Sequence, residues 1–250
     1  SSFQRWFMSL CRKRNNLPDP RADDEALPLE DLALLRQGVY RYLAAAFQYP
    51  DEEWLAAYPP IAEALSDETS SLKSFAFWGD WEEFLSAMSE VGEAERESLG
   101  EIYTKDLMMA DPAEGCSPCE SSWGKREDIA LLMGELDGLY AEVGLVVDGS
   151  LHQTPDHASV QLEFLSALCG LEAEAWARED SIVGAKILRR QIDFLENHTG
   201  RWISAFAEGL FKRRGRELYA VAANAVEVFV AHEKDLIVTL LGNFKEEVKS

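Results

Sequence analysis

The chain has 250 residues, of which 47% are hydrophobic and 10% aromatic, and its 45 acidic against 24 basic side chains give a net charge of -21. This composition allows a buried core, in one large domain or in two small ones that share a core. The charge opposes binding to nucleic acid and to anionic membranes, which both require Lys and Arg, whereas a cationic partner such as an Arg-containing peptide would be attracted. High solubility alone would also account for the charge.

The first 28 residues are predicted to form a tail. Basic and apolar side chains are mixed in it, namely Arg5, Arg12, Lys13 and Arg14 with Phe3, Trp6, Phe7, Met8 and Leu10. Polar residues follow this cluster, whereas a secretory signal would continue with an apolar segment, so we expect a cytoplasmic protein. The pattern also fits a short amphipathic helix that docks on the rest of the chain or on a partner. No apolar run reaches the ~18 to 20 residues that span a bilayer, so we expect no stable membrane insertion.

Residues 29–250 are predicted to form one all-α domain, a bundle-like array of nine to eleven helices. Apolar residues recur there at spacings of three and four, and no segment alternates with the period of two typical of strands. Before residue 110, a helix is expected at 29–49, and Asp51 is expected to be the N-cap of a second helix. Further helices are expected at 61–65, within 72–88 and at 99–107. After residue 122, they are expected at 123–143 with Gly144 as C-cap, from Thr154 to Leu171, and at 181–197, 201–212 and 216–241.

The segment 110–122 is predicted to be a loop or hinge, and a loop of this length is uncommon unless it has a function. It contains Cys116-Ser-Pro-Cys119, a pattern found in thiol oxidoreductases and in half of a zinc site, which His152 or His157 could complete. No strand and helix context surrounds the pair and no second pair follows it. We therefore expect no metal and no cofactor, and a thiol or zinc-dependent enzyme using this loop remains the alternative function.

Other catalytic patterns are weaker. A metal-dependent hydrolase built on Asp156 and His157 would need more ligands, and His198 and His232 lie in predicted helices without a metal-binding pattern. These two histidines are expected to be exposed or satisfied in the core. Lys212-Arg213-Arg214 is expected to be a solvated helix face.

The start of the helix predicted after Gln153 is the most informative junction in the chain. Thr154 is a suitable N-cap, Pro155 suits the first helical position, and Asp156 would lie in the first turn, where the helix dipole favours an anion. A stripe of apolar residues follows at helical spacing, made of Val160, Phe164, Leu168 and Leu171. This pattern alone predicts a well-capped core helix.

The same junction resembles the signature of the TorD/DmsD/NarJ family, cytoplasmic chaperones that mature molybdenum enzymes. The resemblance rests on Pro155-Asp156-His157 and the helix after it, with Gln153 where the signature usually has Glu. Two further segments in the same order are similar to family motifs, namely Leu99-x-x-x-Tyr103-x-x-x-Leu107-Met108 and Ser117-Pro-Cys-Glu120-Ser121-Ser-Trp123. The pattern is most similar to chaperones of the nitrate reductase and dimethyl sulfide dehydrogenase type.

This resemblance implies a binding protein rather than an enzyme. It would bind the twin-arginine signal peptide and the apo form of a molybdopterin-dependent catalytic subunit, assist cofactor insertion and delay export, either as a monomer or as a homodimer. The implied client-binding residues are Gln153, Pro155, Asp156, His157, Tyr103, Glu120, Ser121 and Trp123. A groove between helices would take the apolar part of the signal while Asp156 contacts an arginine directly. His157 is expected to resist protonation and to form hydrogen bonds as a neutral group.

Overall fold

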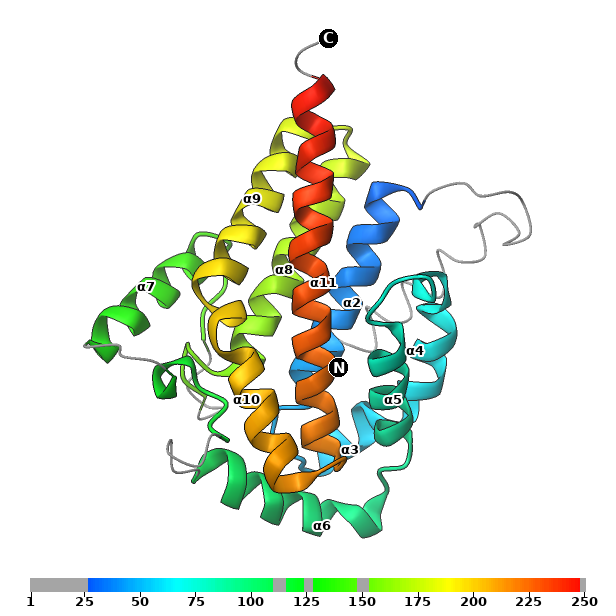
Figure 1. Cartoon of the computed structure of the whole chain (residues 1–250), viewed down its shortest axis with the longest axis vertical. Helices are drawn as coiled ribbons and strands as arrows, with labels where there is room; N and C mark the ends of the chain where they lie inside the picture. The colour runs from blue at the N-terminus through cyan, green and yellow to red at the C-terminus, as the bar shows by residue number, and fades with distance from the viewer. Residues whose placement is uncertain (1–26, 110–115, 124–127, 148–152, 248–250) are drawn as a thin grey trace.

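The computed structural model describes residues 27–109, 116–123, 128–147 and 153–247, with the side chains of 245–247 left aside. These residues form helices and connecting turns, without a strand, which confirms the expected all-α class (Figure 1). The number of helices in the described residues, α2 to α11, agrees with the expected nine to eleven. The predicted tail up to residue 26, with its proposed short helix, and residues 110–115 of the predicted hinge lie outside the described residues.

The elements follow one another in a simple order. In the first half of the chain they are α2 (Leu29–Ala45), α3 (Glu52–Ala57), the 3₁₀ turn Pro59–Ile61, α4 (Ala62–Glu68), the 3₁₀ turn Ser70–Leu72, α5 (Trp78–Ser89), α6 (Glu93–Ile102) and a π-helix at Tyr103–Met108. In the second half they are the 3₁₀ turn Glu120–Ser122, α7 (Ile129–Ala141), α8 (Ala158–Ala177), α9 (Ser181–Asn197), α10 (Thr199–Arg214) and α11 (Leu218–Glu247).

The long helices α2, α8, α9, α10 and α11 run roughly upright side by side, and α6 crosses the lower end of the bundle (Figure 1). Contacts between α2 and α8 are the most extensive, and α11 packs against α10, α5 and α9. The hydroxyl of Tyr219, at the start of α11, donates to the carbonyl oxygen of Leu99 in α6 at 3.3 Å, which fixes the crossing helix to the bundle. Helix α7 lies at the side of the bundle (Figure 1).

Helix α8 lies in the core and packs mainly against α2 and α9. Phe164 and Leu168 of the expected stripe are buried, whereas Val160 and Leu171 are partly buried. Side chains outside that stripe, including Leu162 and Leu165, are fully buried too. A helix that is apolar on most sides belongs inside a bundle rather than on its surface.

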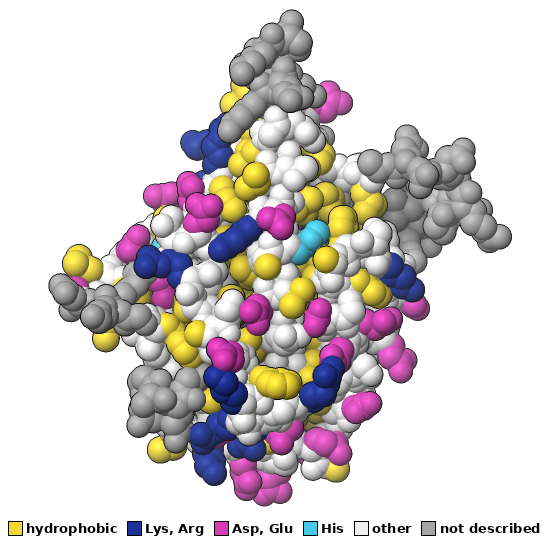
Figure 2. Space-filling model, viewed as in Figure 1, with side chains coloured by type: hydrophobic (Ala, Val, Ile, Leu, Met, Phe, Trp, Pro, Cys, Tyr) yellow, Lys and Arg dark blue, Asp and Glu magenta, His cyan; other side chains and the backbone are white. Residues whose placement is uncertain are grey.

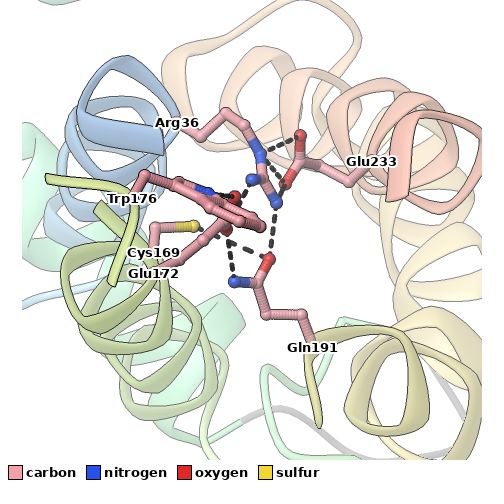
Figure 3. A network of polar contacts seen from close by, with 6 residues as sticks. All are labelled: Arg36, Cys169, Glu172, Trp176, Gln191 and Glu233. Atoms are coloured by element: carbon pink, nitrogen blue, oxygen red, sulfur yellow. Dashed lines mark hydrogen bonds and ion pairs between the residues drawn. The ribbon is translucent and has the colours of Figure 1, made fainter. Parts of the chain in front are cut away.

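A network of buried polar side chains joins four of the long helices around Arg36 (Figure 3). The guanidinium of Arg36 on α2 donates to both carboxylate oxygens of Glu233 on α11, at 3.0 and 2.9 Å, and to Glu172 on α8 at 2.7 Å. It also donates to the amide oxygen of Gln191 on α9 at 2.5 Å. The indole of Trp176 donates to the other oxygen of Glu172 at 3.0 Å. We call these five residues the Arg36 network.

Several helix ends match the sequence predictions, and others do not. Asp51 caps α3 by accepting from the backbone N–H of Trp54 at 2.8 Å, and Gly144 has the positive φ of 76° that suits a residue just after a helix. Trp123, in contrast, was expected in a helix and lies before it, because Asp128 provides the N-cap of α7 through the N–H of Leu131.

The expectation of a solvated face at Lys212-Arg213-Arg214 was incomplete: Lys212 and Arg213 are exposed and Arg214 is partly buried, but both arginines pair with a buried carboxylate. Asp106, in the π-helix, is buried, and its carboxylate accepts from Arg213 at 2.8 Å and from Arg214. A buried carboxylate requires such partners, and two cations at the end of α10 provide them. Lys212 lies on the surface and pairs with Glu208. None of the helices in the described ranges combines the length and hydrophobicity required to cross a bilayer.

Candidate functional site

The segment Thr154-Pro155-Asp156-His157 forms a turn before α8 rather than its first helical residues. The backbone N–H of His157 donates to the carbonyl oxygen of Thr154 at 3.0 Å, and α8 begins at Ala158 with His157 as its N-cap. The predicted cap at Thr154 and the predicted helical position of Pro155 were therefore wrong. The reason is tertiary, since the carbonyl of Pro155 accepts from the Tyr140 hydroxyl at 2.6 Å and Asp156 is bound by the preceding loop.

Asp156 holds this turn to the loop that precedes α7. Its side chain is 1% exposed, and its carboxylate accepts from the N–H of Ser121 at 2.9 Å and from the hydroxyl of Thr154 at 2.6 Å. The backbones also pair, because Glu120 donates to the carbonyl of Asp156 at 3.0 Å and Ala158 to that of Pro118 at 2.7 Å. We call residues 116–123 and 153–159 together the loop–α8 junction.

Glu120 connects the junction to the interior. Its buried carboxylate accepts from the amide of Gln161 at 2.6 Å and lies 3.2 Å from Nδ1 of His198. The amide oxygen of Gln161 accepts in turn from the Thr199 hydroxyl at 2.9 Å and from the indole of Trp202 at 3.3 Å. One glutamate of the loop thus reaches both α8 and the start of α10.

Gln161 was not predicted as a site residue, although its position in the sequence is informative. It is a polar residue at a fully buried position within an apolar helix, and such residues require hydrogen-bond partners. His198 was expected to be exposed or satisfied in the core, and it is buried and bonded. His232 is half-buried between the rings of Phe75 and Phe77, and burial lowers its pKa.

His157 is buried, and this burial lowers the pKa of its imidazole to about 4, against a smaller opposing effect of Asp156. The side chain therefore stays neutral at pH 7, as expected, although burial rather than the helix dipole is the main cause. Its Nδ1 lies 2.8 Å from the hydroxyl of Ser159, and that hydroxyl donates to the amide oxygen of Gln153 at 2.9 Å. The residue that replaces the Glu of the family signature is thus part of this hydrogen-bond chain.

Trp123 and Tyr103, the two aromatic residues of the predicted site, also contact the other residues of the site or their neighbours. The indole of Trp123 donates to the carbonyl of Ser117 at 3.0 Å, and its ring stacks against Trp202 at 6.4 Å between centroids. The hydroxyl of Tyr103 donates to the carbonyl of Phe47 at 3.0 Å. Burial raises the pKa of Tyr103 to about 12, although a hydrogen bond with Gln153 acts in the other direction. All eight predicted residues are therefore linked through a continuous series of contacts.

The thiols of the loop lack the properties of catalytic cysteines. Cys116 is fully buried, and burial raises the pKa of Cys119 to about 11, whereas a reactive thiol needs a lowered pKa. Neither forms a disulfide with another cysteine of the described residues. In the described part of the chain, no group of three or more His, Cys, Asp or Glu is placed to hold a metal ion. His152, the other zinc ligand considered, lies outside that part.

A cavity of about 1020 Å³ opens beside Tyr49 and α6, and we call it the α6 groove. Its lining includes Tyr49, Glu97, Gly100, Glu101, Met109 and Arg213. The ring of Tyr49 packs edge-on against Tyr103 with centroids 5.5 Å apart, so this tyrosine pair separates the groove from the loop–α8 junction. The π-helix that follows α6 forms another part of the wall, and short π-helical segments frequently occur at functional sites.

The groove combines exposed apolar surface with carboxylates. Tyr49 is 50% exposed and Met109 76% exposed, while the exposed Glu97 and Glu101 lie one helical turn apart. The rim also has cations, of which Arg96 is paired with Glu93 at 3.0 Å and Arg213 with Asp106, and Lys105 is exposed. Figure 2 shows acidic side chains gathered at the lower end of the molecule, where α6 lies, beside a group of basic ones.

Comparison with known proteins gives a consistent result. A family model described as "Nitrate reductase delta subunit" matches residues 59–208, a range that contains Tyr103 and the loop–α8 junction. The chain is 32% identical over 133 residues to the chaperone protein TorD of Vibrio cholerae serotype O1 strain ATCC 39315, covering 52% of this chain and 58% of that protein. TorD of strain M66-2 is 28% identical over 140 residues, which are 54% of this chain and 61% of the relative.

The perchlorate reductase assembly chaperone protein of Dechloromonas aromatica is 22% identical over 237 residues, which cover 87% of this chain and 97% of that protein. The matches to TorD span only about three fifths of the length of those relatives. No solved structure gives a significant match. These relatives are named as chaperones, in agreement with the expectation of a protein that is not an enzyme. The family match covers more than half of the chain, which therefore belongs to the nitrate reductase delta subunit family, the TorD/DmsD/NarJ family of redox enzyme maturation chaperones.

Proposed function

We propose that this protein is a cytoplasmic chaperone for the catalytic subunit of a molybdopterin-dependent oxidoreductase. It binds the twin-arginine signal peptide and the apo form of that subunit, assists cofactor insertion and delays export until maturation is complete. The family membership and the chaperones among the relatives support this role. The surface where the peptide binds is, in this proposal, the α6 groove.

The observation that carries the proposal is the pair of carboxylates of Glu97 and Glu101. They lie beside the exposed ring of Tyr49 and the exposed side chain of Met109. Two carboxylates at positions i and i+4 destabilise a helix by roughly 0.2–0.5 kcal/mol, and a cation bound between them would relieve this repulsion. Guanidinium groups match carboxylates with two parallel hydrogen bonds. An adaptable apolar surface that contains methionine suits the variable apolar part of a signal peptide.

The loop–α8 junction would serve binding by fixing the groove wall. Tyr103 is the connecting residue, because it contacts Gln153 on the inner side and the ring of Tyr49 on the outer side. Asp156 is buried and its two oxygens accept hydrogen bonds from Ser121 and Thr154, so an arginine could reach this carboxylate only after the junction opens. We therefore propose an indirect role for Asp156 and its neighbours in client binding.

Titration calorimetry with a twin-arginine signal peptide tests the proposal. A control peptide has its two arginines replaced by lysines, which cannot form the two parallel bonds. We expect micromolar binding of the first peptide and at least about tenfold weaker binding of the second, since a hydrogen bond to a charged group contributes ~1.5–3 kcal/mol. If neither peptide binds the folded protein, the proposed function fails.

Two matched pairs of substitutions locate the site. Glu97→Gln with Glu101→Gln should weaken binding of the arginine peptide about tenfold or more. Glu63→Gln with Asp67→Asn removes a similarly spaced, exposed acidic pair from α4 and should leave the affinity unchanged. Equal losses in both double variants would mean that only net charge matters, and the α6 groove would not be the binding surface.

A further inference from the structure

The N-terminal residues have the chemistry that the α6 groove would recognise in a client. Between residues 3 and 14 the sequence combines basic with large apolar side chains and has no Asp or Glu, although the whole chain has a net charge of -21. The side chains concerned are Arg5, Arg12, Lys13 and Arg14 with Phe3, Trp6, Phe7, Met8 and Leu10. This segment lies outside the described part of the chain, so its chemistry is taken from the sequence.

The connection to the folded part is long enough to reach the groove. Leu27 packs, partly buried, against the core just before α2. From there, α2 runs about 24 Å at ~1.5 Å per residue to Ala45, and Tyr49 in the groove wall follows four residues later. Residues 14 to 27 can span about 45 Å when extended. The tether therefore exceeds the length of the helix that it must pass.

The groove offers both kinds of contact that this segment needs. The exposed surfaces of Tyr49 and Met109 can cover aromatic side chains, and the carboxylates of Glu97 and Glu101 can pair with a base. The volume of about 1020 Å³ is at the upper end of the range for ligand pockets and can take several side chains. Of the three rim cations, Arg96 and Arg213 are already paired within the fold and oppose a cationic occupant less than free cations would, whereas Lys105 is exposed.

We propose that residues 3–14 dock in the α6 groove of the same molecule and keep it occupied until a client signal peptide displaces them. The competition with a client rests on the function proposed above, whereas docking itself does not. A tethered segment acts at an effective concentration of about 1 mM, so even a weak affinity of about 100 μM would leave the groove free in about one molecule in ten. The apparent affinity for a client would then be reduced about tenfold.

Photo-crosslinking in the full-length chain tests the docking step. With Trp6→p-benzoylphenylalanine, irradiation at high dilution should give a crosslink within one molecule, and mass spectrometry should place it in the peptide that contains residues 96–109 or at Tyr49. Glu97→Gln with Glu101→Gln should reduce the yield several-fold, whereas Glu63→Gln with Asp67→Asn should not. Crosslinks elsewhere in the chain, to a second copy, or none at all would overturn the proposal.

Calorimetry with the twin-arginine peptide tests the competition. Trp6→Ser with Phe7→Ser, in otherwise full-length protein, should tighten the apparent affinity for the peptide about tenfold. An unchanged affinity would overturn the competition even if the crosslink forms. If the crosslink lies in the groove and no variant binds the peptide, docking within the molecule is upheld and the proposed client chemistry fails. If the peptide binds and the crosslink does not form, the proposed function is upheld and docking within the molecule fails.

Discussion

The molecule contains two buried polar networks that differ in composition and location. The Arg36 network has one guanidinium and two carboxylates, and each of its charged groups comes from a different long helix (Figure 3). The loop–α8 junction relies on main-chain groups, hydroxyls and a neutral imidazole around Asp156 and Glu120. The first network lies among the upright helices, and the second lies behind the wall of the α6 groove.

This difference shows how two kinds of polar burial serve different purposes. Strongly paired charges such as Arg36 and Glu233 specify which helices lie together, since a wrong arrangement would leave a buried charge without a partner. A network of weaker, directional bonds fixes the path of a loop without closing it permanently. We therefore expect damage to the first network to lower the free energy of unfolding most, and damage to the second to cost less stability while it also disturbs the groove.

The largest effect is expected for Arg36→Met. It leaves Glu172 and Glu233 buried without their cation, and breaking a buried ion pair typically costs about 3–5 kcal/mol. Urea unfolding should show this loss as a lower midpoint. The triple variant with Glu172→Gln and Glu233→Gln, which removes the charges together, should recover at least half of it. A single variant with a loss below about 1 kcal/mol would refute the view that this network holds the helices together.

An acid-dependent loss of similar size is expected from His157 in the junction. Its pKa is about 4 in the folded protein and about 6.5 in the unfolded chain, so the unfolded state binds more protons as the pH falls. Its contribution is constant above pH 6.5, decreases through the window from 6.5 to 4, and reaches about 3 kcal/mol lost below it. The difference in unfolding free energy between the wild type and His157→Asn isolates this effect, and a difference that does not vary with pH would contradict the assignment.

Asp156→Ala should cost about 1–3 kcal/mol, because the N–H of Ser121 and the hydroxyl of Thr154 lose their acceptor. Amide hydrogen exchange should accelerate at Ser121 and Glu120 while the Arg36 helices stay protected. Asp137→Ala, at an exposed position of α7, is the control and should change stability by less than about 0.5 kcal/mol. Faster exchange throughout the bundle would mean that the two networks are not separable.

The smallest effect is expected at Asp51, which belongs to neither network. Asp51→Ala removes the N-cap of α3 and should cost about 1 kcal/mol in thermal or urea unfolding. Glu53→Ala, two residues later and exposed, should cost less, because its side chain provides no such bond. Equal losses for the two variants would show that the cap bond contributes nothing beyond the acidic charge near the helix start.

The sequence predicts those features that depend on neighbouring residues. The range 181–197 agrees with α9 at both ends, because Asp180 caps it and the apolar spacing is regular. The motif residues quoted for the resemblance also lie in one connected set of contacts, while their role in client binding stays a prediction. The Thr154 cap was wrong because the carboxylate of Asp156 binds Ser121, a residue 35 positions away. No local pattern marks such a partner.

The Arg36 network and the α6 groove were not predicted for the same reason, because both depend on residues that are far apart in the sequence. Arg36 looks like an ordinary polar residue in an amphipathic helix, and its partners on other helices cannot be read from spacing. Arg213 and Arg214 looked like a solvated basic cluster, because the buried acceptor Asp106 lies in a distant π-helix. Paired charges inside a protein depend on the fold, so they are recognised only after it is known.

The spread of the Arg36 network along the chain has a consequence for synthesis on the ribosome. Arg36 leaves the ribosome before its partner Glu233, which follows 197 residues later. At about 5–20 residues per second, translation takes roughly 10–40 s to cover this interval. During that time the guanidinium of Arg36 on α2 cannot yet pair with Glu233, because α11 has not been made. The Arg36 network can therefore close only after α11 has been made, so the core of the bundle stays incomplete until that point of translation.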